Sequence, residues 1–338
     1  MIKEIENAPL LGRNSFGIDA KASRLVEFGN AAELAAYLAA REHADAPTAV
    51  IGGGNNILFT EDFRGTLLHC VGTDFAITGN TKNKVIVRAE AGLDWDDFVS
   101  RCINLGLWGA ENLSAIPGTV GAAPVQNIGA YGAEAGDIIH SVELLDMTTL
   151  KESVLAGEHC CFGYRDSIFK HALKGRVVIC AVNFALSREP SPILGYGALE
   201  HETAKLGDPT LENIRRAVTG IRSAKLPDPA VIGNAGSFFK NPLVPLRKAE
   251  ELKERFPEMP VYPGDTPEEV KIPAGWLIEK SGWKGAALGR AGVYEKQALI
   301  LVNRGGATGK DIIALSDAIT EDVASKFGIR IEPEVNIW

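Results

Sequence analysis

Two glycine-rich segments offer exposed backbone that could wrap a ligand. The first, residues 52–56 with the sequence GGGNN, follows an apolar run that ends at Ile51. Glycine permits tight turns, and backbone N–H groups beside short Asn side chains can bind the oxygens of a pyrophosphate. The spacing differs from the G-x-G-x-x-G pattern of dinucleotide-binding folds, so a plain tight turn explains it equally well.

The second segment covers residues 111–132 and is rich in glycine and alanine. So few bulky side chains suit close approach of the backbone to a flat cofactor, although a purely structural loop is the alternative. A third stretch, residues 304–311, superficially resembles a phosphate-binding P-loop. Its spacing is one residue short and Asp311 stands where Ser or Thr would bind Mg²⁺, so we interpret Thr308 as a helix cap.

Three polar side chains of types used in proton transfer and anion binding stand in distinctive contexts. Arg165 lies in the run FGYRDS, Ser237 in NAGSFFKNP and Glu334 in EPEV. Each has a structural explanation by itself: an ion-paired surface Arg, a loop Ser and a strand-end Glu. None of them alone assigns a function.

The composition limits the classes of function. The chain has 338 residues, 46% of them hydrophobic, and a formal net charge of −8. The negative charge argues against a general nucleic-acid surface, because phosphate binding relies on clustered Lys and Arg. No segment reaches the roughly 18 uninterrupted apolar residues of a membrane helix, and the first residues show no secretory signal. We therefore predict a cytoplasmic protein without a nucleic-acid, membrane or obligatory protein partner.

The five cysteines are odd in number and include no C-x-x-C pair. We expect reduced thiols in apolar strands or helices, and no metal site. They are Cys70, Cys102, Cys160, Cys161 and Cys180.

The hydrophobic pattern and the length predict helices and strands in two or three domains. Asp94 can cap a helix that Gly106 stops, and Gly328 can end another. The prolines in residues 225–229 mark a boundary. The other expected helices cover residues 31–41, 211–224 and 311–327, and the expected strands cover 48–51, 84–91, 140–146 and 176–186.

Taken together, these segments resemble the UDP-N-acetylenolpyruvoylglucosamine reductase family. Seven family motifs occur here in order, which is far more specific than any one of them. They are NSFG at 14–17, GGGNN at 52–56, IPGTVG at 116–121, NIGAYG at 127–132, YRDS at 164–167, GSFFKNP at 236–242 and EPEV at 332–335. Tyr196, between two glycines in a long insert, resembles the subclass whose tyrosine loop closes over the substrate.

The resemblance implies an α+β protein with the vanillyl-alcohol-oxidase/PCMH-type FAD-binding fold in two α+β subdomains, plus a separate α+β substrate-binding domain. On that pattern, residues 1–74 form FAD-binding subdomain 1 and residues 75–226 form subdomain 2, to which residues 329–338 return. Residues 227–328 form the substrate-binding domain.

The resemblance also implies non-covalent FAD and NADPH. Related covalent flavoproteins often place a linking His beside the glycine turn, where this chain has Asn. Ala122 and Ala123 stand where some relatives carry serines, which leaves only backbone donors there. The expected cofactor contacts are Gly52, Gly53, Gly54, Asn55, Asn56, Ile116, Pro117, Gly118, Gly121, Ala122, Asn127, Gly129 and Tyr131.

The implied activity is reduction of UDP-N-acetylglucosamine enolpyruvate to UDP-N-acetylmuramate in peptidoglycan synthesis. The resemblance assigns Arg165 to the charge that develops on the substrate, Ser237 to proton donation, and Glu334 to an assisting carboxyl with a raised pKa. The expected substrate contacts are Tyr196, Arg222, Lys225, Asn241 and Gln297.

Two alternatives remain at this point. A flavin-dependent sugar or alcohol oxidase would share the cofactor fold without needing the Ser237 and Glu334 motifs. A non-catalytic flavin or UDP-sugar binding protein would keep the glycine loops but could lose the three catalytic side chains.

Overall fold

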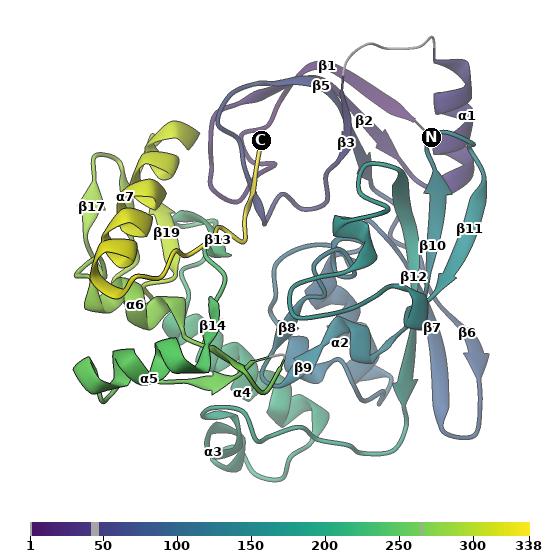
Figure 1. Ribbon diagram of the computed structural model, residues 1–338. Coiled ribbons are helices and arrows are strands. Elements are labelled where there is room, and N and C mark those ends of the chain that lie inside the picture. The colour runs from purple at the N-terminus through teal and green to yellow at the C-terminus, as the bar shows by residue number, and fades with distance from the viewer. Residues whose placement is uncertain (1, 42–46, 265) are drawn as a thin grey trace. The chain divides into compact units, whose positions relative to one another are not determined.

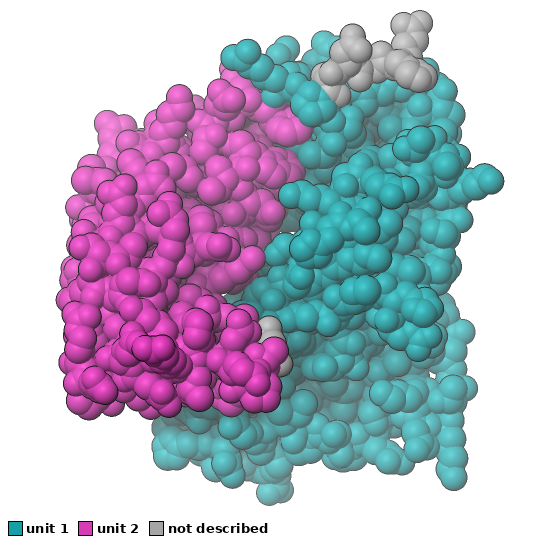
Figure 2. Space-filling model, in the orientation of Figure 1, with its two compact units in different colours: residues 1–8, 22–53, 64–224 teal, residues 9–21, 54–63, 225–338 magenta. Residues whose placement is uncertain are grey.

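The computed structural model describes residues 2–41, 47–264 and 266–338, which fold into two compact units (Figures 1 and 2). Unit 1 comprises residues 1–8, 22–53 and 64–224, and unit 2 comprises residues 9–21, 54–63 and 225–338. The predicted boundary at 225–229 coincides with the return of the chain to unit 2. Residues 9–21 and 54–63, from the predicted first subdomain, also belong to unit 2, so this division differs from the three parts expected. Which part binds which ligand stays a prediction.

Unit 1 contains two larger sheets and one small hairpin. In the first sheet the order is β1 (Lys3–Pro9), β2 (Lys21–Phe28), β5 (Phe63–Cys70) and β3 (Thr48–Val50), with β3 and β5 parallel. In the second, antiparallel sheet the order is β11 (Glu152–Ala156), β10 (Ile139–Asp146), β12 (Val177–Ser187), β7 (Lys84–Glu90) and β6 (Phe75–Asn80). The hairpin pairs β8 (Gly129–Ala130) with β9 (Ala133–Glu134).

The helices of unit 1 follow the local signals in the sequence. They are α1 (Ala31–Ala40), α2 (Trp95–Asn104), α3 (Leu199–Ala204) and α4 (Leu211–Lys225). The Asp94 side chain caps α2 by accepting the Asp97 N–H, and Gly106 follows its end at a φ of 68°. The buried face of α2 places Phe98 against Phe184 of β12, with ring centroids 4.3 Å apart. The predicted cap and stop are confirmed.

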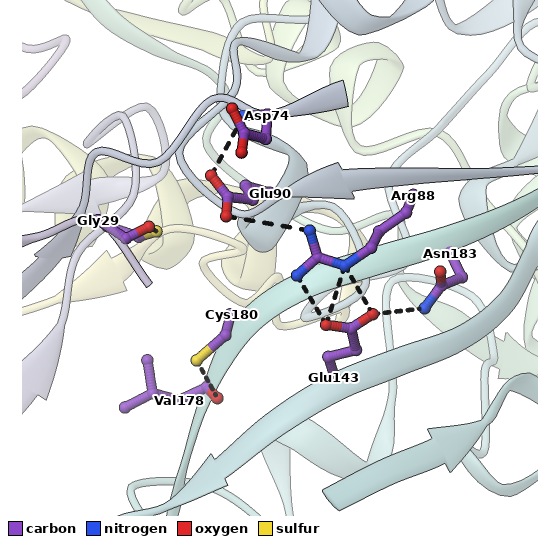
Figure 3. A network of polar contacts seen from close by, with 9 residues as sticks. Gly29, Asp74, Arg88, Glu90, Glu143, Val178, Cys180 and Asn183 are labelled. Carbon is purple, nitrogen blue, oxygen red and sulfur yellow. Dashed lines mark hydrogen bonds and ion pairs between the residues drawn. The ribbon is translucent and has the colours of Figure 1, made fainter. Parts of the chain in front are cut away.

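A polar network ties together the strands of the five-stranded sheet (Figure 3). Arg88 on β7 forms a two-pronged ion pair with Glu143 on β10, with Nη2 2.8 Å from Oε2 and Nε 2.9 Å from Oε1. Asn183 on β12, between them, donates to Glu143 Oε1 at 3.1 Å. Burial alone would raise the pKa of Glu143, but the bonds from Arg88 and Asn183 outweigh it and hold that pKa below its usual value.

Unit 2 contains two antiparallel sheets and a parallel strand pair. The first sheet has the order β13 (Gly233–Ser237), β19 (Ile300–Asn303), β18 (Ala291–Val293) and β17 (Ala287–Leu288). The second has the order β14 (Leu243–Pro245), β16 (Glu269–Lys271) and β15 (Tyr262–Pro263). The helices are α5 (Leu246–Arg255), α6 (Ala274–Lys280) and α7 (Gly309–Phe327), and α7 lies against the β17–β18–β19 strands (Figure 1).

Helix α7 begins and ends where the sequence predicts. Thr308 and Asp311 cap each other's backbone N–H groups, and Gly328 ends the helix in the left-handed region at a φ of 64°. A Cβ added at Gly309 would collide with the Phe59 carbonyl oxygen. The glycine in this P-loop-like stretch therefore serves close packing of the helix start.

The last strand, β20 (Asn336–Ile337), pairs in parallel with β4 (Ile57–Leu58). Strand β4 follows directly after the glycine turn, within the range predicted as subdomain 1, whereas residues 329–338 were expected to return to subdomain 2. The Trp338 ring packs against Phe59 at 5.6 Å. This pairing fixes the segment that carries Glu334.

Four of the five cysteines are buried free thiols, as predicted, but Cys161 is exposed. Cys161 lies in irregular backbone with a φ of 50°, and Cys160 in a bend, so the prediction of a strand or helix was wrong for both residues. Within the described residues, no helix combines the length and apolar character that crossing a membrane requires.

Candidate active site

The glycine turn at residues 52–56 begins just after β3. Ile51 extends the strand by donating its N–H to the Leu68 carbonyl at 2.9 Å. Gly54 has a φ of 67°, and a Cβ added there would collide with the Arg13 carbonyl oxygen. Left-handed backbone and this close approach both exclude a side chain, so position 54 requires glycine.

The segment that contains Gly118 and Gly121 packs closely against its neighbours in unit 1. The Gly121 N–H donates to the Ala91 carbonyl at 2.9 Å, and a Cβ added at Gly121 would lie 2.5 Å from the Ala91 Cβ. A Cβ added at Gly52 would lie 2.8 Å from Thr119 Oγ1. The two glycine-rich segments singled out in the sequence therefore meet at Gly52.

The backbone at this meeting point fits a flat, phosphate-bearing cofactor such as FAD. Gly118 has a φ of 138°, and apart from its chain neighbours no group of the described residues lies within 4 Å of the place where its Cβ would stand. Gly53 and Pro117 are exposed, and Ile116 and Ala122 are half-buried. Because glycine has no side chain, a cofactor can approach its backbone N–H groups closely. The apolar residues offer a surface against which the ring system of the cofactor can pack.

The remaining expected cofactor contacts lie in the β8–β9 hairpin and two residues before it. They are Asn127, Gly129 and Tyr131. Tyr131 is half-buried, with its ring centroid 6.4 Å from that of Tyr196, and burial raises its pKa. Asn127 is 1% exposed, and its side-chain amide is bonded to protein groups on both the nitrogen and the oxygen. A contact between Asn127 and the cofactor would therefore use its backbone.

Arg165 lies in unit 1, in a tight turn whose ends, Gly163 and Asp166, bond to each other through both backbone N–H groups at 3.1 Å. It is half-buried and has a φ of 55°. Its Nη2 donates to the Gly129 carbonyl at 2.9 Å, and its guanidinium carbon lies 5.4 Å from the centre of the Tyr164 ring. The cation is held on an aromatic face beside the cofactor hairpin, where its charge can act on an anionic ligand.

Ser237 is the last residue of β13 in unit 2 and is exposed. The register shifts between Asn234 and Ser237, and Gly236 has a φ of 68°, so the chain kinks just before the serine. Phe238 and Phe239, which follow, are 0% and 1% exposed and anchor the kink. Within the described residues, no hydrogen bond involves the Ser237 hydroxyl.

Glu334 lies next to Ser237 through backbone pairing in unit 2. The Glu334 N–H donates to the Phe238 carbonyl at 2.7 Å, and the Lys240 N–H donates to the Glu332 carbonyl at 2.9 Å. Asn56 Nδ2 lies 3.4 Å from the Glu334 carbonyl oxygen. The structure thus brings together the serine, the glutamate and the end of the glycine turn, which are far apart in the sequence.

Tyr196 is 60% exposed and is flanked by Gly197 at a φ of 62°. A Cβ added at Gly132 would lie 3.5 Å from the Tyr196 Cβ, so this segment lies against the hairpin that carries Tyr131. The tyrosine hydroxyl is therefore presented on the surface of unit 1 beside the expected cofactor residues.

Arg222 and Lys225 lie one turn apart near the end of α4. Arg222 Nε donates to the Ala115 carbonyl at 3.1 Å, next to the expected cofactor contact Ile116. Burial lowers the pKa of Arg222, against the opposing influence of Tyr131 and Asp96. Lys225 is exposed, so its ammonium group can bind a diphosphate without first breaking a hydrogen bond to the protein such as the one Arg222 makes.

Asn241 and Gln297 come together at the start of α6 in unit 2. Asn241 Oδ1 accepts the Ala274 N–H at 3.0 Å, and a Cβ added at Gly275 would lie 3.2 Å from Gln297 Oε1. Gln297 Oε1 also lies 3.3 Å from the Leu299 N–H. Both side chains are half-buried and partly committed to holding the helix start.

Three side chains at this site escaped the sequence-based prediction. Asn112, 2% exposed, donates through Nδ2 to the carbonyls of Tyr131 and Ile193, each at 2.8 Å, while its Oδ1 has no partner among the described residues. Lys170 Nζ donates to the carbonyl of Arg165 at 2.9 Å, and Glu134 bonds to Asn127. Residue type alone does not separate side chains held by such bonds from solvated ones.

Comparison with known protein families identifies first the class of the chain and then its family. Residues 22–149 match the family described as FAD binding domain, so the glycine turn and the segment at 111–132 lie in an FAD-binding domain. Residues 228–338 match the family described as UDP-N-acetylenolpyruvoylglucosamine reductase, C-terminal domain.

Full-length relatives agree with these matches. The chain is 48% identical to the UDP-N-acetylenolpyruvoylglucosamine reductase of Bacteroides fragilis (strain YCH46) over 97% of this chain and 98% of that protein. It is 45% identical to the enzyme of the same name from Pseudomonas aeruginosa, over 98% of each chain. The chain therefore belongs to the UDP-N-acetylenolpyruvoylglucosamine reductase family. The crystal structure of the Thermus caldophilus enzyme shares the fold, with a TM-score of 0.69 at 22% identity over 100% of this chain and 99% of that one.

Proposed function

We propose that this protein reduces UDP-N-acetylglucosamine enolpyruvate to UDP-N-acetylmuramate for peptidoglycan synthesis, with FAD as cofactor and NADPH as reductant. Family membership over nearly the whole chain and the FAD-binding domain support this activity. One structural observation carries the catalytic assignment: an exposed Ser237 hydroxyl without a hydrogen bond among the described residues lies directly before residues whose backbone pairs with the segment of Glu334, beside the glycine turn.

The cofactor and the protein divide the chemistry between them. Bound FAD, once reduced by NADPH, would supply hydride to the enolpyruvyl double bond. Residues 52–56 and 116–122 hold the cofactor mainly through backbone N–H groups, with Tyr131 at its edge. The glycine turn carries Asn55 and Asn56 instead of a histidine that could form a covalent bond to the flavin.

Arg165 neutralises the charge that develops on the substrate carboxylate. Its guanidinium stays protonated and presents a planar fork, and the Tyr164 ring and the Gly129 carbonyl hold it in place. Ser237 gives its proton to the carbon next to the carboxylate, because a carbanion-like centre is basic enough to deprotonate a well-placed hydroxyl. Glu334 assists as a protonated or hydrogen-bonded carboxyl, and its raised pKa stays a prediction.

The UDP moiety is bound by a few cations and polar groups rather than by a basic face. Lys225 is the first candidate for the diphosphate, Arg222 supports the neighbouring cofactor segment, and Tyr196 closes over the substrate, as in the subclass with a tyrosine loop. Asn241 and Gln297 bind from the start of α6. The free thiols suit a reducing cytoplasm, which is where we place the reaction.

A direct assay tests the activity. Purified protein should oxidise NADPH only when UDP-N-acetylglucosamine enolpyruvate is present, and should form UDP-N-acetylmuramate in equal amount. A flavin-dependent oxidase would instead consume oxygen with a sugar or alcohol, and a binding protein would turn over nothing.

Two matched variants test the catalytic assignment within one segment. Glu334→Gln should slow turnover by about 10²-fold, as loss of an acid–base group commonly does. Glu332→Gln removes an exposed carboxyl two residues away and should leave turnover unchanged. Equal rates for the two variants would show that Glu334 has no part in the reaction.

A further inference from the structure

The turn that carries Arg165 is strained and needs support. A φ of 55° is uncommon for a residue with a side chain and costs of order 1 kcal/mol or more. Two backbone bonds between Gly163 and Asp166 close the turn, but they do not fix where the turn lies. Contacts from outside the turn must therefore hold the guanidinium in place.

Asn127 supplies such a contact through its bond to Gly163, and both polar atoms of its side chain are hydrogen-bonded. Nδ2 donates to the Gly163 carbonyl at 3.0 Å and to Glu134 Oε2 at 2.7 Å. Oδ1 accepts the Gly136 N–H at 2.7 Å. The residue is 1% exposed, so water cannot replace a lost partner without entering a closed site.

The hairpin and the residues before it contact Arg165 and the residue just after its turn at two further points. Arg165 Nη2 donates to the Gly129 carbonyl, and Ser167 Oγ donates to the Val125 carbonyl at 2.6 Å. A Cβ added at Gly129 would lie 2.9 Å from Arg165 Nη1, so the guanidinium lies directly over the hairpin backbone. The position of the hairpin thus sets the position of the cation.

We infer that Asn127 is a positioning residue for Arg165, which connects the cofactor hairpin to the turn that carries this catalytic cation. The inference rests on the role proposed above for Arg165. Loss of the Asn127 bonds frees the turn at Gly163, and a displacement of about 1 Å in a positioned group can cost about 10²-fold in rate. The effect is confined to the step that uses Arg165.

Asn127→Asp is the sharpest perturbation. It keeps the shape of the side chain but removes both donors, and it brings a second carboxylate to the place 2.7 Å from Glu134 Oε2. At pH 8 we expect substrate-driven reoxidation of the reduced flavin to slow by about 10²-fold. We expect NADPH-driven flavin reduction and FAD affinity to stay within about twofold of wild type, since neither uses Arg165 and the substitution keeps the backbone through which Asn127 would contact the cofactor.

Two further readouts separate positioning from a general structural role. Lowering the pH toward 5 should restore part of the reoxidation rate of Asn127→Asp, because two adjacent carboxylates share a proton that restores one hydrogen bond. In the Arg165→Ala background, Asn127→Asp should not slow flavin reoxidation further, because Asn127 affects this step only by positioning the Arg165 side chain. Melting temperature and calorimetric affinity for the substrate are measured on the same samples.

The outcomes are distinguishable. If Arg165→Ala is slow but Asn127→Asp reoxidises at the wild-type rate, Asn127 does not position Arg165. If the Asn127→Asp loss persists in full in the Arg165→Ala background, or appears equally in both half-reactions, Asn127 acts through the flavin or the fold and the inference is overturned. If Arg165→Ala reoxidises normally, the proposed role of Arg165 fails first and takes the inference with it. Asn127→Ser, which keeps a hydroxyl donor, replaces Asn127→Asp in the same cycle if that variant loses FAD.

Discussion

Replacing Ser237 with Ala should separate the chemistry from the fold. The Ser237 backbone pairs with Ile300 in the sheet, and Phe238 and Phe239 anchor the chain directly after it. The exposed hydroxyl makes no hydrogen bond in the described parts of unit 2, so the substitution breaks no internal contact. We expect the free energy of unfolding to change by no more than about 0.5 kcal/mol, as for surface substitutions in general.

The catalytic cost of the same substitution should be large. Loss of a positioned proton donor commonly costs roughly 10²–10⁴-fold in rate. This range corresponds to about 3–5 kcal/mol in the activation free energy of the step. The contrast between an unchanged fold and a barrier raised by several kcal/mol is the prediction.

Stopped-flow absorbance of the flavin measures the two half-reactions separately. NADPH should bleach the flavin of Ser237→Ala at a near-normal rate, because hydride transfer from NADPH needs no proton donor to the substrate. The reduced variant, mixed with substrate, should stay bleached far longer than wild type, and Ser237→Cys should recover part of the rate. Ser223→Ala, at an exposed serine on α4, is the matched control. Reoxidation of Ser237→Ala at the wild-type rate would mean that Ser237 is a structural residue.

Three further predictions concern the loop, the cofactor and the response to pH. Tyr196→Phe should raise the KM for the UDP-sugar by about tenfold with FAD retained, the cost of one hydrogen bond to a charged group; unchanged kinetics would remove Tyr196 from the site. Acid precipitation should release FAD into the supernatant, and flavin in the pellet would reveal a covalent link. Urea unfolding should give opposite pH trends for two Glu→Gln variants. Burial raises the pKa of Glu111, so the folded wild type loses stability as the pH rises above 4.5 and this carboxyl group must ionise. Glu111→Gln carries no ionisable group there, so its stability relative to the wild type should increase toward pH 7. The pKa of Glu143 is lowered, so Glu143→Gln should be less stable at pH 7, with the difference vanishing in acid; parallel trends would contradict both assignments.

Local signals in the sequence predicted α1, α2, α4 and α7, but not α3, α5 and α6. The two helices with clear caps were predicted well because a cap is decided by neighbouring residues. Asp94 and Gly106 bound α2, and Thr308 and Gly328 bound α7, within a residue or two of the expected positions. The side chain of a cap and the backbone it satisfies lie within one turn, so the pattern is visible in a short window.

The pairing of strands that are far apart in the sequence could not be predicted from local sequence patterns. The parallel pairing of β20 with β4 joins residues almost 280 positions apart, Asn336 with Ile57. Neither two-residue strand has a periodicity of its own, and backbone pairing leaves no mark on residue type. The motif resemblance placed Glu334 at the site, but only the structure shows that it stands beside Ser237 and Asn56.

Backbone strain gives independent support to the site. Among the described residues, seven with side chains have a positive φ: Asn7, Ala115, Asn127, Tyr131, Leu150, Cys161 and Arg165. Three of these lie in the segment at 111–132, and Arg165 and Cys161 lie in or just before the turn that Asn127 holds. Strain of this kind persists only where surrounding contacts fix it, and it gathers at ligand-binding and catalytic positions. Ala115 fits that rule, because its N–H bonds to Asp96 at 2.6 Å and its carbonyl to Arg222. The residues with strained backbone, and the hydrogen bonds that hold them, therefore lie in the loops that the proposed reaction uses. A loop with a purely structural role would not need such strain.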